Sequence, residues 1–286
     1  MLSMNTESDA RLAVRAVRAG AAVVREMYGT SLQRFEKGGG DFATAADVAA
    51  EKAILDVLRT ARPDDAVTGE ESGRTGAEAA ERRWLVDPLC GTLNYAVNTM
   101  VVAVNVALRE GSSITAAAVA DPFGGEVFWT DGERARLRSG GTGGADGTGG
   151  ADGTDGTDEE LAPSSGSRLV DVNLDPPFPN APGFRAVALL ADPGFAEHFR
   201  PRVVSSTLAV TWVAAGRRAA YVTDGRLRDS VHFSAGIALC QAAGCVVTDL
   251  RGLPPHTGAG GLVVAADAET HALLLEMIRN QESGIG

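Results

Sequence analysis

One short stretch constrains the fold of this chain more than any other, because it joins an apolar strand to an acidic turn. It reads Trp84-Leu85-Val86-Asp87-Pro88-Leu89-Cys90-Gly91-Thr92-Leu93-Asn94-Tyr95. Asp87, at the end of the predicted strand, offers hard oxygen ligands for Mg²⁺. The backbone N–H groups of Gly91 and Thr92, at the start of the next segment, can receive phosphate oxygens. A plain strand-to-helix turn with an Asp cap has the same pattern, so the stretch alone leaves both interpretations open.

The same stretch resembles the Asp-Pro-(Ile/Leu)-Asp-Gly-Thr-x-Asn-(Phe/Tyr) signature of the inositol monophosphatase family. The exception is Cys90, which stands where the family has its second Asp. Two other motifs have family counterparts in the same order, namely the loop with Lys37 that leads into Asp41–Asp47, and the strand end Gly69-Glu70-Glu71-Ser72. The family consists of metal-dependent, lithium-sensitive phosphatases.

The resemblance covers nearly the whole chain of 286 residues and implies an α/β fold, a layered α-β-α-β-α sandwich like those of inositol monophosphatase and fructose-bisphosphatase. We expect an N-terminal α+β half over residues 1–138, which carries most of the metal and phosphate motifs, and a C-terminal α/β half over residues 161–286. Residues 139–160 form a low-complexity insert, in which Gly-Thr-Gly-Gly-Ala-Asp occurs at 141 and again at 147. Such a segment has too little apolar surface to bury, so it is expected to be a disordered or surface loop.

Apolar periodicity places the secondary structure. In the first half, helices are predicted over residues 6–28 and 47–61, and strands over 66–72, 84–86, 100–108, 113–120, 125–130 and 134–138. In the second half, strands are predicted over residues 185–190, 203–204, 219–222, 245–249 and 262–266, and helices over 192–199, 205–215, 234–243 and 270–279.

Bulk composition excludes several function classes. The net charge of −11 argues against a nucleic-acid partner, and the absence of an apolar run of about 18 residues argues against a membrane span. Three cysteines without disulfide-framework spacing agree with a reducing compartment. We therefore expect a cytoplasmic protein, and the resemblance implies a homodimer that acts on a small phosphorylated substrate.

The resemblance also assigns roles to individual residues. Mg²⁺ ions would polarise the phosphate and activate a water. Glu70, Asp87 and the backbone carbonyl of Leu89 would hold the first ion.

The remaining roles implied by the resemblance concern water and substrate. Thr92, with its hydroxyl polarised by Asp47, would orient the attacking water, and the amides of Gly91 and Thr92 would hold the phosphate. Substrate hydroxyls would be contacted by Ser205, Ser206 and Asp224. Val204 replaces a glycine that the family has before this helix start, which signals a changed substrate pocket.

The second metal position departs from the family. Cys90 replaces one of its aspartates, and His232 stands where the family's Trp-Asp-x-Ala-(Ala/Gly)-Gly motif has the other, with Asp229 three residues earlier as a less well spaced candidate. A neutral thiol and an imidazole are poor ligands for Mg²⁺, so fewer Mg²⁺ ions than in the family are expected.

Three interpretations remain open from the sequence. The first is a phosphatase with a degraded second metal site. The second is a repurposed enzyme in which Asp87, Cys90 and His232 hold Zn²⁺, or in which Cys90 and His232 carry acid/base or covalent chemistry on another reaction. The third is a non-catalytic relative that binds a small ligand or a partner chain. Taken singly, Cys90 is equally typical of a small buried residue, and His232 of a polar residue at a helix start.

Overall fold

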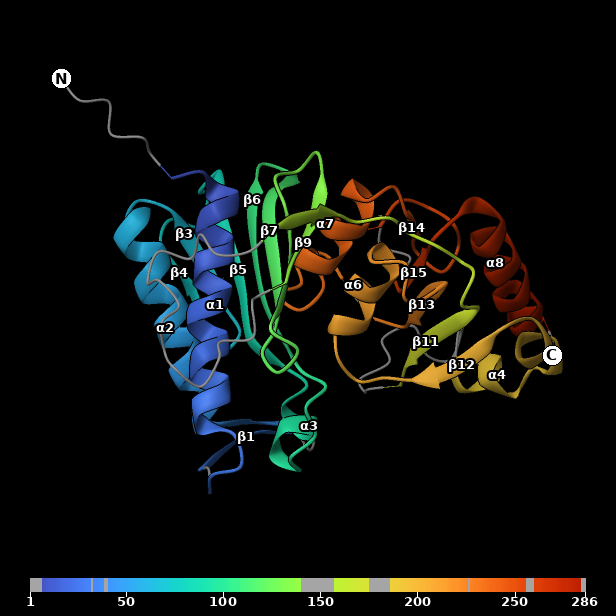
Figure 1. Ribbon diagram of the computed structural model, residues 1–286, viewed down its shortest axis with the longest axis horizontal. Helices are drawn as coiled ribbons and strands as arrows, with labels where there is room; N and C mark the ends of the chain where they lie inside the picture. The colour runs from blue at the N-terminus through green and yellow to red at the C-terminus, as the bar shows by residue number, and fades with distance from the viewer. Residues whose placement is uncertain are drawn as a thin grey trace.

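In the described part of the chain, two large sheets alternate with three layers of helices, in the order helix, sheet, helix, sheet, helix (Figure 1). The structure is a computed structural model that describes residues 7–31, 33–38, 41–139, 157–174, 186–225, 227–255 and 260–283. The arrangement confirms the α-β-α-β-α sandwich expected from the sequence.

The first sheet contains eight strands in the described part of the chain. Their order is β10 (Asp158–Glu160), β9 (Ala135–Ser139), β8 (Glu126–Thr130), β7 (Ser113–Asp121), β6 (Ala103–Glu110), β5 (Arg82–Cys90), β3 (Ala66–Gly69) and β4 (Gly73–Thr75). Neighbours are antiparallel except β3 and β5, which run parallel. Trp84 and Val86 face one core and Leu85 the opposite one, as the alternation of a strand requires. Because both faces of the sheet are covered, the apolar run at 84–86 is unbroken.

The outer helices α1 (Asp9–Met27) and α2 (Ala45–Ala61) cover one face of this sheet (Figure 1). Buried side chains recur along α1 at helical spacing, as the sequence predicts. The two helices approach closely at Gly20, where an added Cβ would lie 2.7 Å from Ile54 Cδ1. A short hairpin, β1 (Arg34–Gly38) and β2 (Asp41–Thr44), leads directly into α2.

The middle layer consists of α6 (Leu208–Ala214) and α7 (Ser234–Ala242), which pack between the two sheets. The second sheet has the order β12 (Arg200–Val203), β11 (Leu169–Asn173), β13 (Ala220–Thr223), β15 (Leu262–Ala265) and β14 (Val246–Thr248). Its other face is covered by α4 (Ala186–Ala191), α5 (Pro193–His198) and α8 (Ala268–Ser283), which enclose a third core. The short α3 (Thr92–Ala96) follows β5.

One predicted element has the wrong type. Residues 186–191 form the helix α4 rather than part of a strand at 185–190. The segment Ala-Val-Ala-Leu-Leu-Ala is rich in strong helix formers, and it stops before Asp192, which caps α5 by accepting from Gly194 N at 2.7 Å. Leu189 is buried in the third core and Leu190 packs against it, which docks the helix there. Strand β11 was not predicted at all.

The predicted insert at 139–160 is described only at its two ends, and residues 140–156 lie outside the described part. Ser139 ends β9, and residues 158–160 form β10, an exposed strand paired with β9. Asp158 accepts from Trp129 Nε1 at 3.0 Å and pairs with Arg138 at 2.6 Å. These contacts explain why the acidic end of a low-complexity segment forms a strand. The division of the chain at 138 and 161 stays a prediction.

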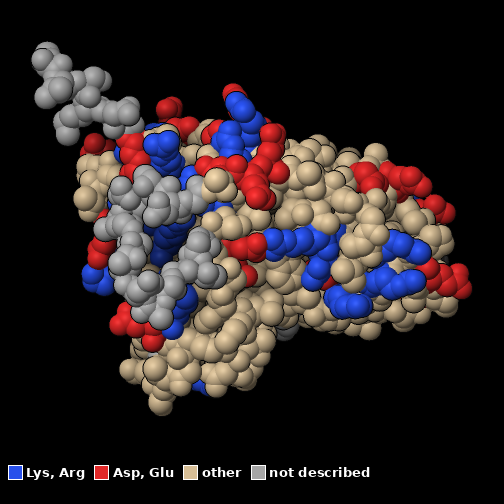
Figure 2. All heavy atoms as spheres, viewed as in Figure 1, with Lys and Arg blue, Asp and Glu red and all other residues tan. Residues whose placement is uncertain are grey.

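Charged side chains of both signs are interspersed on the face drawn in Figure 2, over both halves of the molecule. Ion pairs join strands of the first sheet to neighbouring segments. Arg217, after α6, pairs with Glu126 of β8, and Arg82 of β5 pairs with Asp65, which lies before β3. Among the described residues, no helix is long and apolar enough to cross a membrane.

Candidate functional site

The site is built at the end of β5, where the strand changes register against β6. Asp87 pairs with Asn105 and Cys90 with Ala103, so that two residues of β5 oppose one of β6. Pro88 lies in this bulge, where its missing N–H costs no ladder bond. The Asp87 side chain is fully buried, and its Oδ1 accepts from Leu89 N at 3.1 Å. The buried Asp87 carboxylate therefore lies at the point where the bulge interrupts the regular pairing of β5 with β6.

Gly91 turns the chain sharply after β5. Its φ is +105°, and an added Cβ would lie 3.0 Å from Val101 O and 3.3 Å from Ser205 O. Asn94 Nδ2 donates to the same two carbonyls, each at 2.9 Å. The turn after β5 is thus held against the segment that leads into α6.

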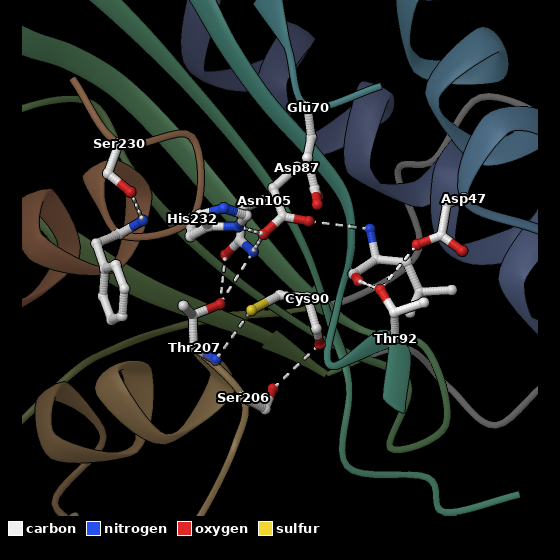
Figure 3. Close-up of polar contacts among 12 residues, drawn as sticks. Asp47, Glu70, Asp87, Cys90, Thr92, Asn105, Ser206, Thr207, Ser230 and His232 are labelled. Atoms are coloured by element: carbon white, nitrogen blue, oxygen red, sulfur yellow. Dashed lines mark hydrogen bonds and ion pairs between the residues drawn. The ribbon is translucent and has the colours of Figure 1, made fainter. Parts of the chain in front are cut away.

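On one side of this turn, Asp47 and Thr92 are in contact (Figure 3). Thr92 Oγ1 lies 2.9 Å from Asp47 Oδ1 and 3.2 Å from Leu89 O, both of which are acceptors. The other oxygen of Asp47 accepts from Thr44 N at 2.8 Å and Thr44 Oγ1 at 2.6 Å, which completes a capping box on α2. Burial raises the pKa of Asp47, although its hydrogen bonds oppose the shift. The residue therefore caps α2 and orients Thr92 with the same carboxylate.

Glu70 follows β3 and joins the site from above Asp87 in Figure 3. Lys37 pairs with both Glu70, at 2.9 Å, and Glu71, at 2.6 Å. Burial and the neighbouring charge of Asp87 raise the pKa of Glu70 to about 8, although Lys37 and His232 oppose the shift. A raised carboxyl pKa beside another carboxylate marks a place where added positive charge is favourable.

On the other side of Asp87 lie Cys90 and His232 (Figure 3). His232 Nδ1 is 2.8 Å from Asp87 Oδ2, and Cys90 Sγ accepts from Thr207 N at 3.4 Å. One ligand atom from each of Asp87, Cys90 and His232 lies within 4.8 Å of the others. Asp229, the alternative from the sequence, instead pairs with Arg109 at 3.2 Å. The structure therefore brings His232, rather than Asp229, to the cluster.

The protonation of this group follows from its surroundings. Burial lowers the pKa of His232, but the Asp87 carboxylate outweighs burial, so the pKa is raised well above its ordinary value. Burial and the charge of Asp87 raise the pKa of Cys90. Without a metal, the geometry thus favours an imidazolium paired with Asp87 beside a neutral thiol.

The three residues predicted to contact substrate hydroxyls, Ser205, Ser206 and Asp224, have different surroundings in the structure. Ser206 is buried. Its Oγ donates to Cys90 O at 3.4 Å and accepts from Leu208 N at 3.3 Å, so the hydroxyl stabilises the first turn of α6. Ser205 contributes its backbone carbonyl to the contact with Asn94. Asp224 is buried directly after β13. Roles for these residues in substrate binding remain predictions.

Two residues of the site, Asn105 and Glu51, were not predicted from the sequence. Asn105 Nδ2 donates to Asp87 Oδ2 at 3.3 Å and to Thr207 Oγ1 at 3.0 Å. Glu51 is buried on α2, and its carboxylate accepts from the backbone N–H groups of residues 71 and 72 at 2.8 and 2.7 Å, which shapes the loop after Glu70. The signal for Glu51 was a charged residue on the buried face of a helix; Asn105, a polar residue inside an apolar strand, offered the same kind of signal.

The two predicted metal positions differ in how well their residues suit Mg²⁺. Asp87 is a buried oxygen donor and Glu70 a partly buried one, and a divalent cation would relieve the repulsion between their charges, so the first position fits Mg²⁺. The second position combines one carboxylate with a thiol and an imidazole, a donor set that does not fit Mg²⁺.

Comparison with known sequences gives consistent matches over almost the full length. The sequence profile of the inositol monophosphatase family matches residues 5–283. An inositol-1-monophosphatase of Caulobacter vibrioides is 29% identical over 271 residues, which cover 93% of this chain and 99% of that protein. A Nus factor SuhB of Escherichia coli is 30% identical over 276 residues, which cover 93% and 94%.

Solved structures share the fold. The extragenic suppressor protein suhB of Bartonella henselae superimposes with a TM-score of 0.78 at 24% identity and covers 96% of this chain and 98% of its own. An IMPase of Thermotoga maritima gives a TM-score of 0.75 at 20% identity, with the same coverage.

Proposed function

Because the chain belongs to the inositol monophosphatase family, we propose that it hydrolyses small phosphomonoesters in a Mg²⁺-dependent reaction. The observation that supports this proposal most is the contact between Thr92 and Asp47 beside the carboxylates of Glu70, which is partly buried, and Asp87, which is fully buried. A hydroxyl held by a buried acid, next to a position suited to a divalent cation, is what activation of water for attack on phosphorus needs.

Mg²⁺ would be held at the first position by Glu70, Asp87 and the backbone carbonyl of Leu89. The ion would supply charge that stabilises the phosphate oxygens and acidifies a bound water. Lys37 pairs with Glu70 and Glu71 and so lies beside the same position, where it adds a further positive charge.

Thr92 would orient the attacking water. Its hydroxyl has a single proton, which both Asp47 Oδ1 and Leu89 O are placed to accept. The lone pairs of Oγ1 are then placed to accept a hydrogen bond from the water. Asp47 is fixed in turn by Thr44 and the α2 N-terminus, so the orientation of Thr92 is set before the substrate arrives.

The turn at Gly91 would receive the phosphate. The first hydrogen bond of α3 runs from Tyr95 N to Gly91 O at 3.0 Å, so the helix itself does not use the N–H groups of Gly91 and Thr92. These two groups are the donors that we assign to phosphate oxygens.

The test is phosphate release from a panel of small phosphomonoesters, with and without Mg²⁺. The name of one relative puts inositol monophosphate first on the panel. Thr92→Val keeps the side-chain shape but removes the hydroxyl, and it is expected to lower kcat about 10²- to 10⁴-fold. Thr60→Val is the matched control, because Thr60 donates to a backbone carbonyl of α2 on the exposed side of that helix.

The expected result is Mg²⁺-dependent release by the native protein and by Thr60→Val, with the activity lost in Thr92→Val. Absence of release from every ester, with Mg²⁺ shown to be bound, would contradict the proposal. That outcome would favour a non-catalytic role, in line with the relatives that carry the name of a Nus factor.

A further inference from the structure

We propose that Asp87, Cys90 and His232 form a binding site for one Zn²⁺ ion, at the position where a second Mg²⁺ would be expected. The inference deepens the proposed function and rests on it only in that Asp87 would serve both ions. Among the residues that the structure describes, this is the one group of three metal-binding side chains close enough to share an ion.

The donor set selects the metal. Mg²⁺ prefers six oxygen ligands and keeps most of its waters. A thiolate, an imidazole and a carboxylate are the three side-chain ligands of Zn²⁺, and thiolate selects soft or borderline ions over Mg²⁺. Replacement of two aspartates therefore does more than weaken a magnesium position, because it supplies the ligands of a different ion.

The distances suit a tetrahedral ion. Zn²⁺ bonds of about 2.0–2.3 Å hold neighbouring donors roughly 3.4–3.8 Å apart. All three donors lie within 4.8 Å of one another, and Asp87 Oδ2 is 2.8 Å from His232 Nδ1. Entry of the ion requires the Asp87–His232 contact to open by roughly half an ångström. Small side-chain rotations achieve changes of this size.

Outer contacts hold the ligands in place, as they do in metal sites generally. The N–H of Thr207 donates to Cys90 Sγ at 3.4 Å and so fixes the position of the sulfur. Asn105 links the two sides of the site by donating to Asp87 Oδ2 at 3.3 Å and to Thr207 Oγ1 at 3.0 Å. Asp87 Oδ1 is fixed separately by Leu89 N at 3.1 Å.

The site is partly exposed to solvent. The His232 side chain is 42% exposed, whereas that of Asp87 is fully buried. His232 therefore lies on the solvent side of the group. Three protein ligands leave the fourth tetrahedral position open, which is the pattern of zinc sites that bind water or substrate rather than of closed structural sites.

The first experiment measures metal retention without substrate. Chelator-stripped protein receives one equivalent of Zn²⁺ in a large excess of Mg²⁺, and bound metals are counted by mass spectrometry after desalting. The expected result is close to one Zn²⁺ per chain. Loss of Zn²⁺ to the Mg²⁺ excess would overturn the inference.

The second experiment identifies the ligands with Co²⁺ as a spectroscopic probe. A tetrahedral Co²⁺ ion with a thiolate ligand shows strong visible bands and a near-ultraviolet thiolate-to-cobalt band. Cys90→Ser should abolish the near-ultraviolet band, and Cys240→Ser should retain it, because Cys240 is buried between the sheets and its thiol donates to Val210 O. A band that survives Cys90→Ser, or disappears in Cys240→Ser, would contradict the assignment.

A third variant guards against misfolding of the ligand variants. Asn105→Ala removes only an outer contact, and it should weaken Zn²⁺ binding about 10- to 100-fold while the thiolate band persists at saturating Co²⁺. Unchanged affinity would count against the site. Because none of these readouts needs a substrate, failure of zinc binding and failure of phosphate release are separate results.

Discussion

Replacing Glu70 with Gln should stabilise the metal-free protein at neutral pH and weaken its response to Mg²⁺. The Glu70 carboxyl has a pKa of about 8 in the folded protein against 4.5 for the ordinary group, because burial and Asp87 disfavour its charge. The unfolded chain therefore releases this proton at lower pH than the folded protein does.

The sign and size of the effect follow from this difference. With the pKa raised on folding, the contribution to stability is complete below pH 4.5 and is lost as pH rises toward 8. Each pH unit inside that window costs about 1.4 kcal/mol and less near its two ends, so the metal-free protein loses about 3–4 kcal/mol between pH 5 and pH 8. The Glu70 side chain is only 18% exposed, so solvent screening reduces this figure little. Gln cannot ionise and avoids the loss.

The assay is urea unfolding in EDTA at pH 5 and pH 8 for the native protein and Glu70→Gln. The stability difference between them should grow by about 3–4 kcal/mol in favour of the variant over this range. Glu78→Gln, which removes an exposed carboxylate, is the control and should follow the native protein. Added Mg²⁺ should then stabilise the native protein much more than Glu70→Gln. Parallel pH profiles for the native protein and Glu70→Gln would refute the reasoning.

Three further changes test other parts of the site. Cys90→Asp combined with His232→Asp restores oxygen ligands, so it should speed Mg²⁺-dependent phosphate release and steepen its dependence on Mg²⁺ concentration; an unchanged Mg²⁺ titration would count against the second position. Gly91→Ala places a Cβ at a φ of +105° and 3.0 Å from a carbonyl oxygen, and should lower the free energy of unfolding by about 1–3 kcal/mol in a urea titration; a change below about 0.5 kcal/mol would contradict the strain. Thr44→Ala removes the hydroxyl that holds Asp47, and should lower both Tm and kcat, whereas a loss of Tm alone would show that Thr44 acts only as a helix cap.

Much of the fold was predictable because its elements carry strong local patterns. Helices α1 and α2 lie where helical spacing predicts them, and the strand before Asp87 is confirmed as part of β5. The errors fall where local pattern is weak or ambiguous. The short apolar run of α4 suits a strand or a helix equally, and its docking onto the third core decides between them. Strand β10 depends on a partner strand and on Arg138 and Trp129, which local sequence does not reveal.

In the site, too, some features were predictable from the sequence and others were not. The motifs predicted which residues would gather, and the structure brings Asp47 to Thr92 and His232 to Asp87. The contacts of Asn105 were not predictable, because they depend on the register of β6 against β5 and on the approach of the α6 segment. Sequence also leaves open how Cys90 and His232 act together, which depends on distances between side chains far apart in the chain.

Two different metals are proposed to bind around Asp87, with Mg²⁺ on the side of Glu70 and Zn²⁺ on the side of Cys90 and His232. Anomalous diffraction from crystals soaked in Mn²⁺, as a stand-in for Mg²⁺, and in Zn²⁺ tests this claim directly. Mn²⁺ is expected between Glu70, Asp87 and the Leu89 carbonyl, and Zn²⁺ between Asp87, Cys90 and His232. Both ions at a single position, or neither ion at the cluster, would contradict the claim.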